Sequence, residues 1–357
     1  MKKFNVMMSL FGLGLFISIF AYSCKDKDEV SGDYANGVFI TNEGNFGSSN
    51  GSVSFYDNAK DSVINDIFNM VNARPLGDVV QSLTIASGKA YMIVNASNKI
   101  EIAERETFKE AGTIGGFAEP RFMVSGSNTA YISQWGDGGK VTVVDLSAQT
   151  IIKSINVGKG PEKMLLHGDY LYVANSGGYE SDSSVSVINT KTNEVVKLII
   201  TKNNPVDLVI DKDNKIWVLC IGSITYSPTY EIVSQTPSYL QKINPSNNEI
   251  EVSIKIGDET HPNCLEISKD KSVLYYGGGF GFVGIYKMDI SASSVPSTKF
   301  IEKSAYGFSV NPSDGVIFVL EATTFTGNGK LHRYSESGSL IKTYTTGIIP
   351  NGAAFKK

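Results

Sequence analysis

Four polar side chains at equivalent points of the sequence could together carry chemistry. Each follows a proline by one or two residues, at the start of a predicted strand; they are Glu162, Asp207, Asn263 and Asn351. Carboxylate and amide oxygens suit a hard cation such as Ca²⁺, which could polarise the carbonyl of a hydrolysable substrate. Strand starts that border a water-filled channel are polar for solvation alone, however, so the main prediction is a protein without a metal.

Other catalytic signatures are missing from the sequence. It contains no His-Glu-x-x-His, no Cys-x-x-Cys pair, no phosphate-binding Gly-Lys-Thr loop and no nucleophile elbow. Three glycines at 277–279 end a predicted strand, but no helix follows them that could hold a phosphate. We therefore predict a protein that is not an enzyme and that requires no cofactor.

The composition is that of a folded, mildly acidic protein. The chain has 357 residues, 41% of them hydrophobic, and a formal net charge of −4. Residues 1–23 carry Lys2 and Lys3 and no acid, which leaves 30 basic against 36 acidic residues in the rest. This balance argues against a nucleic-acid partner, because nucleic-acid-binding domains present basic surfaces.

The elements that must position these residues follow a repeat of about 40–45 residues. Its unit is a proline, an alternating strand, a polar turn, an aromatic-centred strand, a Gly/Asn-rich loop and two further strands. The opening prolines are spaced by 41, 44, 57 and 88 residues, the last being two periods; they are Pro120, Pro161, Pro205, Pro262 and Pro350. The aromatic strand centres keep the same period: Phe39, Tyr91, Tyr131, Tyr172, Trp217, Tyr275 and Phe318.

Seven units of four short strands predict an all-β, seven-bladed β-propeller over residues 37–357. The first unit lacks its leading strand, whereas the chain ends with a leading strand, 349–355, that no unit follows. We expect this C-terminal strand to complete the first blade and so to close the ring without an open sheet edge. A β-sandwich or a solenoid is the alternative fold.

One face of this propeller is predicted to bind a ligand. Loops after second strands and before first strands share that face and are rich in aromatic residues. Seven turns of the opposite face are short, polar and free of them: 86–89, 125–129, 189–194, 211–215, 244–248, 268–272 and 311–315. Large apolar groups with convergent polar groups indicate a recognition surface. The candidate ligand-binding residues are Asn42, Asn45, Phe46, Arg74, Asn95, Phe117, Arg121, Gln134, Trp135, Asn175, Tyr179, Tyr226, Tyr230, His261, Phe280, Tyr306, Phe325 and Asn351.

Some aromatic residues of this face are expected to be buried, and one of its loops is unusually long. Roughly half of its aromatic rings are expected to pack under their own loops as additional core. The spacing of 57 contains an insertion at residues 221–238, with two tyrosines and four β-branched Ile or Val residues. Long loops in compact domains usually serve a function or are disordered. The apolar content of this one predicts an ordered flap, folded as a hairpin.

The N-terminus has the pattern of a lipoprotein signal. Lys2 and Lys3 precede an apolar run that ends in Ala21-Tyr22-Ser23-Cys24. This ending resembles a bacterial lipobox, in which cleavage makes an acylated cysteine the new N-terminus. We expect a signal peptide over 1–23, a lipidated Cys24 with an acidic tether over 24–36, and a membrane attachment by lipid alone. A plain signal peptide or an uncleaved anchor is the alternative.

Short motifs in the repeat resemble known propellers. Phe39-Ile40-Thr41-Asn42 and Tyr172-Val173-Ala174-Asn175 resemble the Tyr-Val-x-Asn repeat of surface-layer-like and YncE-like seven-bladed propellers. The lipobox, the tether and the opening segment 37–56 look like those of BtuG-type surface lipoproteins. Members of that family capture cobalamin and sit as a lid on a BtuB-type TonB-dependent transporter.

The resemblance implies a corrinoid as the bound ligand and a BtuB-type TonB-dependent transporter as the partner. It also implies a lipid-anchored, surface-exposed position on the outer membrane. The rim aromatics would lie against the corrin ring, and the rim amides would pair with its peripheral amides. Arg74 or Arg121 would meet the phosphate of the nucleotide loop. These contacts are assigned by loop position.

Two other functions stay open. Propeller lactonases hold calcium with channel carboxylates, so Glu162 and Asp207 would serve a calcium-dependent hydrolase of that kind. A surface propeller could instead bind a glycan or a protein partner, since stacking aromatics suit a sugar equally well.

Overall fold

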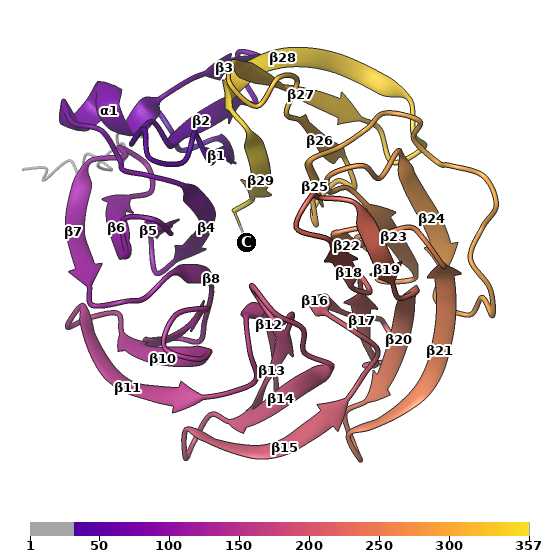
Figure 1. Ribbon diagram of the computed structural model, residues 1–357. Helices are drawn as coiled ribbons and strands as arrows, with labels where there is room; N and C mark the ends of the chain where they lie inside the picture. The colour runs from indigo at the N-terminus through magenta and orange to yellow at the C-terminus, as the bar shows by residue number, and fades with distance from the viewer. Residues whose placement is uncertain (1–31, 357) are drawn as a thin grey trace, which may run out of the picture. The chain divides into compact units, whose positions relative to one another are not determined.

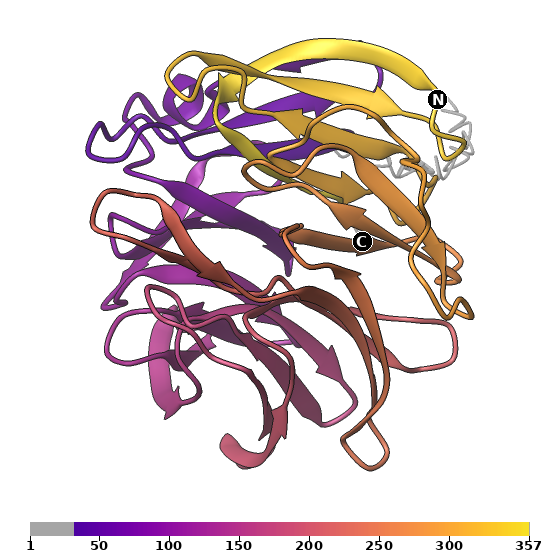
Figure 2. The same ribbon diagram turned by 45° about the vertical axis from the view of Figure 1, so that its right-hand side comes forward.

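Seven small antiparallel sheets stand in a ring around a central channel in the computed structural model (Figures 1 and 2). The structure describes residues 32–356, so the predicted signal peptide, Cys24 and tether residues 24–31 lie outside the described residues. The seven sheets confirm the predicted seven-bladed β-propeller. Within residues 32–356 no helix has the length and apolar character needed to cross a membrane.

Each blade runs from an innermost strand at the channel to an outer strand at the rim of the ring (Figure 1). The innermost strands are β29 (Pro350–Ala354), β4 (Val80–Ala86), β8 (Pro120–Ser125), β12 (Pro161–His167), β16 (Pro205–Ile210), β22 (Cys264–Ile267) and β25 (Gly307–Val310). The second strands are β1 (Gly37–Asn42), β5 (Lys89–Val94), β9 (Thr129–Gln134), β13 (Tyr170–Asn175), β17 (Ile216–Cys220), β23 (Val273–Gly277) and β26 (Ile317–Glu321). We number the blades 1 to 7 in this order.

The outer half of the ring is less regular. The third strands are β2 (Ser52–Asp57), β6 (Lys99–Glu104), β10 (Lys140–Asp145), β14 (Ser184–Asn189), β20 (Ser238–Asn244), β24 (Ile285–Asp289) and β27 (Asn328–Tyr334). The fourth are β3 (Ser62–Ile64), β7 (Glu110–Gly115), β11 (Thr150–Asn156), β15 (Glu194–Ile200), β21 (Glu249–Gly257) and β28 (Leu340–Ile348). Blade 6 has three strands, and a single bridge between Ile285 and Ile301 stands in for its fourth. The preceding segment is rich in serine and contains Pro296, which has no backbone N–H to donate to a ladder.

Seven apolar clusters hold the blades together, one between each pair of neighbours. Every cluster contains one of the periodic aromatic residues predicted from the sequence, and all seven are at most 3% exposed. Trp217 of blade 5, for example, packs with Leu265 and Tyr276 of blade 6. The aromatic period of the sequence is therefore the period of the blade interfaces.

The ring is closed as predicted, by the C-terminal strand. Strand β29 pairs antiparallel with β1, in the register Phe39–Ala354 to Asn42–Pro350. The yellow C-terminal strand and the indigo first strands lie side by side (Figure 1). Phe355 continues the contact, because its ring meets Phe318 of blade 7 at 5.2 Å between centroids.

The chain enters the propeller on the face of the short turns. The N–H of Tyr34 donates to the carbonyl of Glu106 at 2.9 Å, in the turn between β6 and β7. Nη1 of Arg105 donates to the carbonyl of Ala35 at 3.0 Å. The Tyr34 ring is 7% exposed and packs edge-on against Phe55. These contacts attach the chain to the ring a few residues before the first strand.

Removal of residues 350–357 is expected to destabilise the whole ring. The four backbone pairs to β1 would be lost, at roughly 1 kcal/mol for each hydrogen bond, so the free energy of unfolding should fall by about 4 kcal/mol or more. Thermal unfolding and size-exclusion chromatography would measure the loss and any association through the exposed edge of β1. The control deletes only residues 356 and 357. A full truncation that unfolds like this control would contradict the closure.

Candidate functional site

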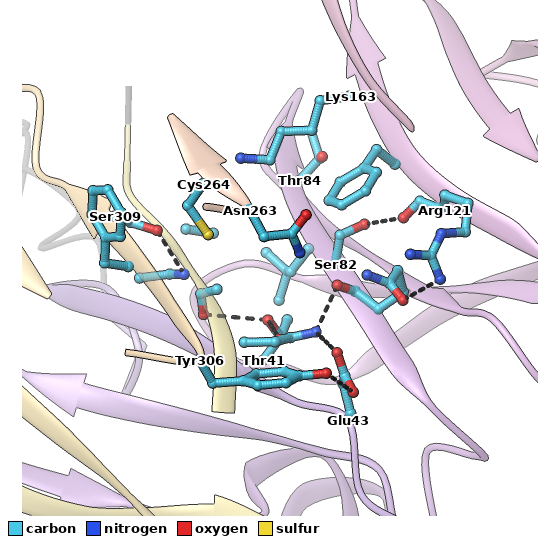
Figure 3. Close-up of a pocket in the computed structure, with 18 of the residues that line it drawn as sticks. Thr41, Glu43, Ser82, Thr84, Arg121, Lys163, Asn263, Cys264, Tyr306 and Ser309 are labelled. Atoms are coloured by element: carbon cyan, nitrogen blue, oxygen red, sulfur yellow. Dashed lines mark hydrogen bonds between the residues drawn. The ribbon is translucent and has the colours of Figure 1, made fainter. Parts of the chain in front are cut away.

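A polar cavity of about 290 Å³ opens at the mouth of the channel (Figure 3). It lies where innermost strands begin, on the face that carries the long loops. Its polar lining includes Glu43, Gln81, Arg121, Lys163, Asn263, Glu266, Tyr306 and Asn351. We call this cavity the mouth cavity.

Arg121, which lines the mouth cavity, forms a largely buried ion pair with Glu162. Nε of Arg121 donates to Oε1 of Glu162 at 3.0 Å, and Nη1 donates to Gln81 at 2.6 Å. The guanidinium also lies 4.1 Å from the ring centroid of Trp135, a cation–π distance. Burial raises the pKa of the Glu162 carboxyl, although Arg121 opposes the change. The predicted ligand contact Arg121 is therefore held by three partners of its own chain.

A second ion pair joins blades 4, 5 and 6. Nζ of Lys163 lies 2.6 Å from Oδ2 of Asp207, which also accepts the backbone N–H of Leu265 at 2.9 Å. Burial raises the pKa of Asp207 against the influence of Lys163. The carboxylates Glu162 and Asp207, which could have held a cation, thus already have cationic side chains beside them.

Two further carboxyls border the cavity without an ion-pair partner among the described residues. Glu43 accepts the Tyr306 hydroxyl at 3.0 Å and Nδ2 of Asn351 at 3.1 Å. Burial raises the pKa of Glu43, and these two hydrogen bonds lower it by less. Burial also raises the pKa of Glu266 to about 7.

Glu266→Gln is expected to stabilise the protein at alkaline pH. The folded carboxyl ionises near pH 7 and the unfolded one near its ordinary value of 4.5, so the folded state binds more protons between these values. Stability therefore falls as the pH rises from about 4.5 to 7, and the neutral amide avoids this loss, which is at most about 3 kcal/mol at pH 8. Urea unfolding at pH 5 and pH 8 measures the difference.

The control for this variant is Glu259→Gln, which changes an exposed carboxylate and should leave stability the same at both pH values. A Glu266→Gln protein that is less stable at pH 8 than at pH 5, relative to wild type, would contradict the ionisation assigned to Glu266.

The structure sorts the predicted ligand-binding residues into four groups. Arg121, Tyr306 and Asn351 line the mouth cavity, and Trp135 packs against Arg121 behind it. On the outer surface of the loops lie Phe46, Tyr179, Tyr226, Tyr230, Phe280 and Phe325, from 39% to 88% exposed. Inside the blades lie Asn42, Phe117, Gln134 and Asn175, at most 6% exposed. Engaged with neighbouring segments are Asn45, Arg74, Asn95 and His261.

The motif asparagines lie inside their blades. Nδ2 of Asn42 donates to Ser54 at 2.9 Å, and Nδ2 of Asn175 donates to Ser184 and Ser186, both at 3.0 Å. Gln134 has the equivalent role in blade 3, where its Oε1 accepts the Thr142 hydroxyl. These amides join the second strand to the third, which leaves them no surface to offer a ligand.

Other predicted polar contacts are also taken up by the chain itself. Arg74 forms a two-fold ion pair with Glu101, at 3.1 and 2.8 Å, and a further one with Glu110. Asn45 donates to the carbonyl of Phe325 at 2.5 Å, which ties a loop of blade 1 to a loop of blade 7. Asn95 donates to the carbonyl of Pro120 at 3.0 Å.

The insertion forms the expected hairpin, and His261 fastens its base. Strands β18 (Ile224–Tyr226) and β19 (Ile232–Gln235) pair with each other only. Nδ1 of His261 lies 2.6 Å from the Ile221 carbonyl, and Nε2 lies 3.1 Å from the Gln235 amide. A two-stranded sheet is barely stable alone, so these two hydrogen bonds of His261, which we call the clasp, help to keep the hairpin folded.

His261→Ala is expected to loosen the hairpin without unfolding the ring. The loss of two hydrogen bonds, about 1 kcal/mol each, should raise the open fraction of the hairpin about 30-fold. Chymotrypsin cleavage after Tyr226 or Tyr230 would then accelerate by that factor. The control is His167→Ala, because His167 ends strand β12 on the face opposite the hairpin. Equal cleavage rates in both variants would contradict the clasp.

A second, smaller cavity of about 220 Å³ lies beside the mouth cavity. Its walls include the rings of Phe280, Phe282, Phe325 and Tyr306, and Tyr306 also lines the mouth cavity. Gly279 and Gly281, which flank Phe280, have φ of +93° and +81°, a region that side-chain-bearing residues rarely adopt. We call this cavity the rim cleft.

Several site residues were missing from the sequence prediction: Glu43, Gln81, Lys163 and Glu266. For Lys163 a signal existed, because Lys163 and Asp207 each stand two residues after a repeat proline and carry opposite charges. Glu43 and Glu266 are recognised only when the ring brings distant segments together.

Solved structures resemble the fold at low identity. A quinonprotein alcohol dehydrogenase-like protein of Bacteroides thetaiotaomicron superposes with a TM-score of 0.63 at 16% identity, over 90% of this chain and 78% of that one. Hydrazine synthase of Kuenenia stuttgartiensis gives 0.58 at 13%, over 75% and 87%. The WD40 β-propeller domain of Doa1 gives 0.58 at 10%, over 81% and 86%.

At these identities the likeness extends to the fold alone. No curated protein matches the sequence. The model of one family, described as DUF5074, a domain of unknown function, matches residues 36–351 and so spans nearly the whole propeller. The chain is therefore a member of the DUF5074 family.

Proposed function

We propose that this protein binds a corrinoid, cobalamin or a close relative, on the aromatic loop face and passes it to a TonB-dependent transporter. One observation carries the proposal. The most exposed aromatic residues, Phe46, Tyr179, Tyr230 and Phe280, are each more than 80% exposed, and all lie on loops of the same face. Large apolar groups gathered in this way mark a surface that is covered by something else.

The chemistry of this face suits a large ligand that is apolar on its faces and polar at its edges. Rigid rings supply flat contact area and lose little conformational entropy on binding. The mouth cavity beneath them offers carboxylate, amide and hydroxyl groups, among them Glu43, Asn263 and Tyr306. A corrin ring with its peripheral amides has the matching pattern.

Guanidinium contacts to the ligand are left out of this proposal. Arg74 and Arg121 already form ion pairs with Glu101 and Glu162, so neither carries an uncompensated charge for a phosphate. The corrinoid phosphate is then expected to stay in solvent, where it is hydrated at no cost.

Location and partner belong to the same proposal. The lipobox at Cys24 and the similarity of residues 24–56 to BtuG-type lipoproteins support a lipid anchor on the outer membrane, exposed at the cell surface. They likewise support a BtuB-type transporter as the partner that takes up the corrinoid.

Calorimetric titration of the full-length protein in detergent with cyanocobalamin tests the proposal. We expect a dissociation constant in the nanomolar range or below, raised about 100-fold in the Phe46→Ala, Tyr179→Ala double variant, since each ring contributes about 1 to 1.5 kcal/mol. The control is Tyr170→Ala, because Tyr170 is 40% exposed on the opposite face. No heat at tens of micromolar ligand, or equal losses in both variants, would refute binding on this face.

A further inference from the structure

We propose that the rim cleft is a separate subsite that takes a flat aromatic group carried on an arm of the ligand. This inference builds on the corrinoid-binding function above, and in a corrinoid the group would be the nucleotide base. The cleft lies between the loop that follows β23 in blade 6 and the loop that follows β26 in blade 7. It is thus formed by two neighbouring blades together.

The rings of the cleft contact one another and together form an aromatic wall against which a flat group can pack. Phe280 and Phe325 have centroids 6.0 Å apart at an interplanar angle of 59°, and Tyr306 meets Phe325 edge-on at 5.7 Å. Phe280 is 85% exposed, so most of its surface is available for contact. Aromatic pairs are favoured at centroid separations of about 4.5 to 7 Å, in tilted and edge-to-face geometries.

The size of the cleft selects a small ring system. An apolar cavity of about 150 Å³ holds one benzene molecule. The rim cleft, at about 220 Å³, is larger by roughly half, which suits a two-ring heterocycle. A corrin macrocycle is far too large for it and would have to lie outside, over the mouth cavity.

Electrostatics favour a neutral group over a cation. Glu321 is the carboxylate that borders the cleft, and its two oxygens lie 2.7 Å from Nζ of Lys303 and 2.8 Å from Nε2 of His332. Its charge is therefore compensated within the chain. Because the Glu321 charge is compensated, we expect the aromatic walls to favour an uncharged ring.

The two cavities are close enough to serve one ligand. Tyr306 lines both, and its ring packs on Phe325 while its hydroxyl donates to Glu43 in the mouth cavity. A ligand with a large flat body over the mouth could therefore place a tethered aromatic base in the cleft next to it; in cobalamin the base would first leave the cobalt, and a water molecule would take the vacated coordination position. Corrinoids that lack the nucleotide arm would occupy the mouth alone.

Titration of the full-length protein with cyanocobalamin and with dicyanocobinamide, which lacks the nucleotide arm, separates the two sites. The wild type should bind cyanocobalamin at least about 10-fold more tightly. The Phe280→Ala, Phe325→Ala double variant should lose that advantage, with its affinity for dicyanocobinamide within about twofold of wild type. Phe46→Ala, outside the cleft, should weaken both ligands by the same factor.

Phe280→Ala alone provides the second variant, because a side chain that is 85% exposed can be truncated without disturbing the fold. It should show the same selective loss at smaller size. Equal affinity of the wild type for both corrinoids, or equal losses of both in the cleft variants, would overturn the cleft subsite and leave corrinoid binding intact. Absence of binding by both corrinoids would overturn the proposed function and the cleft subsite with it.

Discussion

The packing of one aromatic side chain between each pair of blades is the constraint on which the rest of the structure depends. Seven such residues, from Phe39 to Phe318, fill the seven interfaces and are almost fully buried. They stand at the centres of second strands, where each packs in the cluster shared with the neighbouring blade. The loops at the strand ends do not take part in this packing, so their length and composition can vary. The loop of blade 5 that forms the β18–β19 hairpin is an example.

Contacts between neighbouring blades also pair buried charged side chains at the channel mouth. Arg121 and Lys163 compensate Glu162 and Asp207 across blade boundaries, and each pair spares the protein the cost of an isolated charge. Burial raises the pKa of all four carboxyls, and Glu43 and Glu266 form no ion pair among the described residues. The mouth is thus polar but nearly balanced, whereas the rim above it is aromatic, and the two layers suit a ligand with both kinds of surface.

The fold could be predicted from the sequence because every blade needs the same residue types at the same places, so these types repeat along the chain. Proline, aromatic residue and polar turn recur with it, and the missing first strand showed how the ring closes. Side-chain direction at the site could not be predicted in the same way. Asn42 and Asn175 stand at strand ends beside the loop face, yet hydrogen bonds across the blade turn their amides inward. Partners such as Lys163 and Asp207 meet only after 44 residues of chain have formed a complete blade.

The point at which the chain enters the ring has a consequence for orientation. Tyr34 and Ala35 are fastened to the turns of the face opposite the aromatic rim. If Cys24 carries the lipid, residues 24–31 span at most about 28 Å between the bilayer and Gly32. In the proposed lipid-anchored protein, the aromatic rim would then lie on the side of the ring that faces away from the bilayer. If the proposed transporter lies in the same membrane, contact between it and the aromatic rim would require the ring to tilt on this short tether.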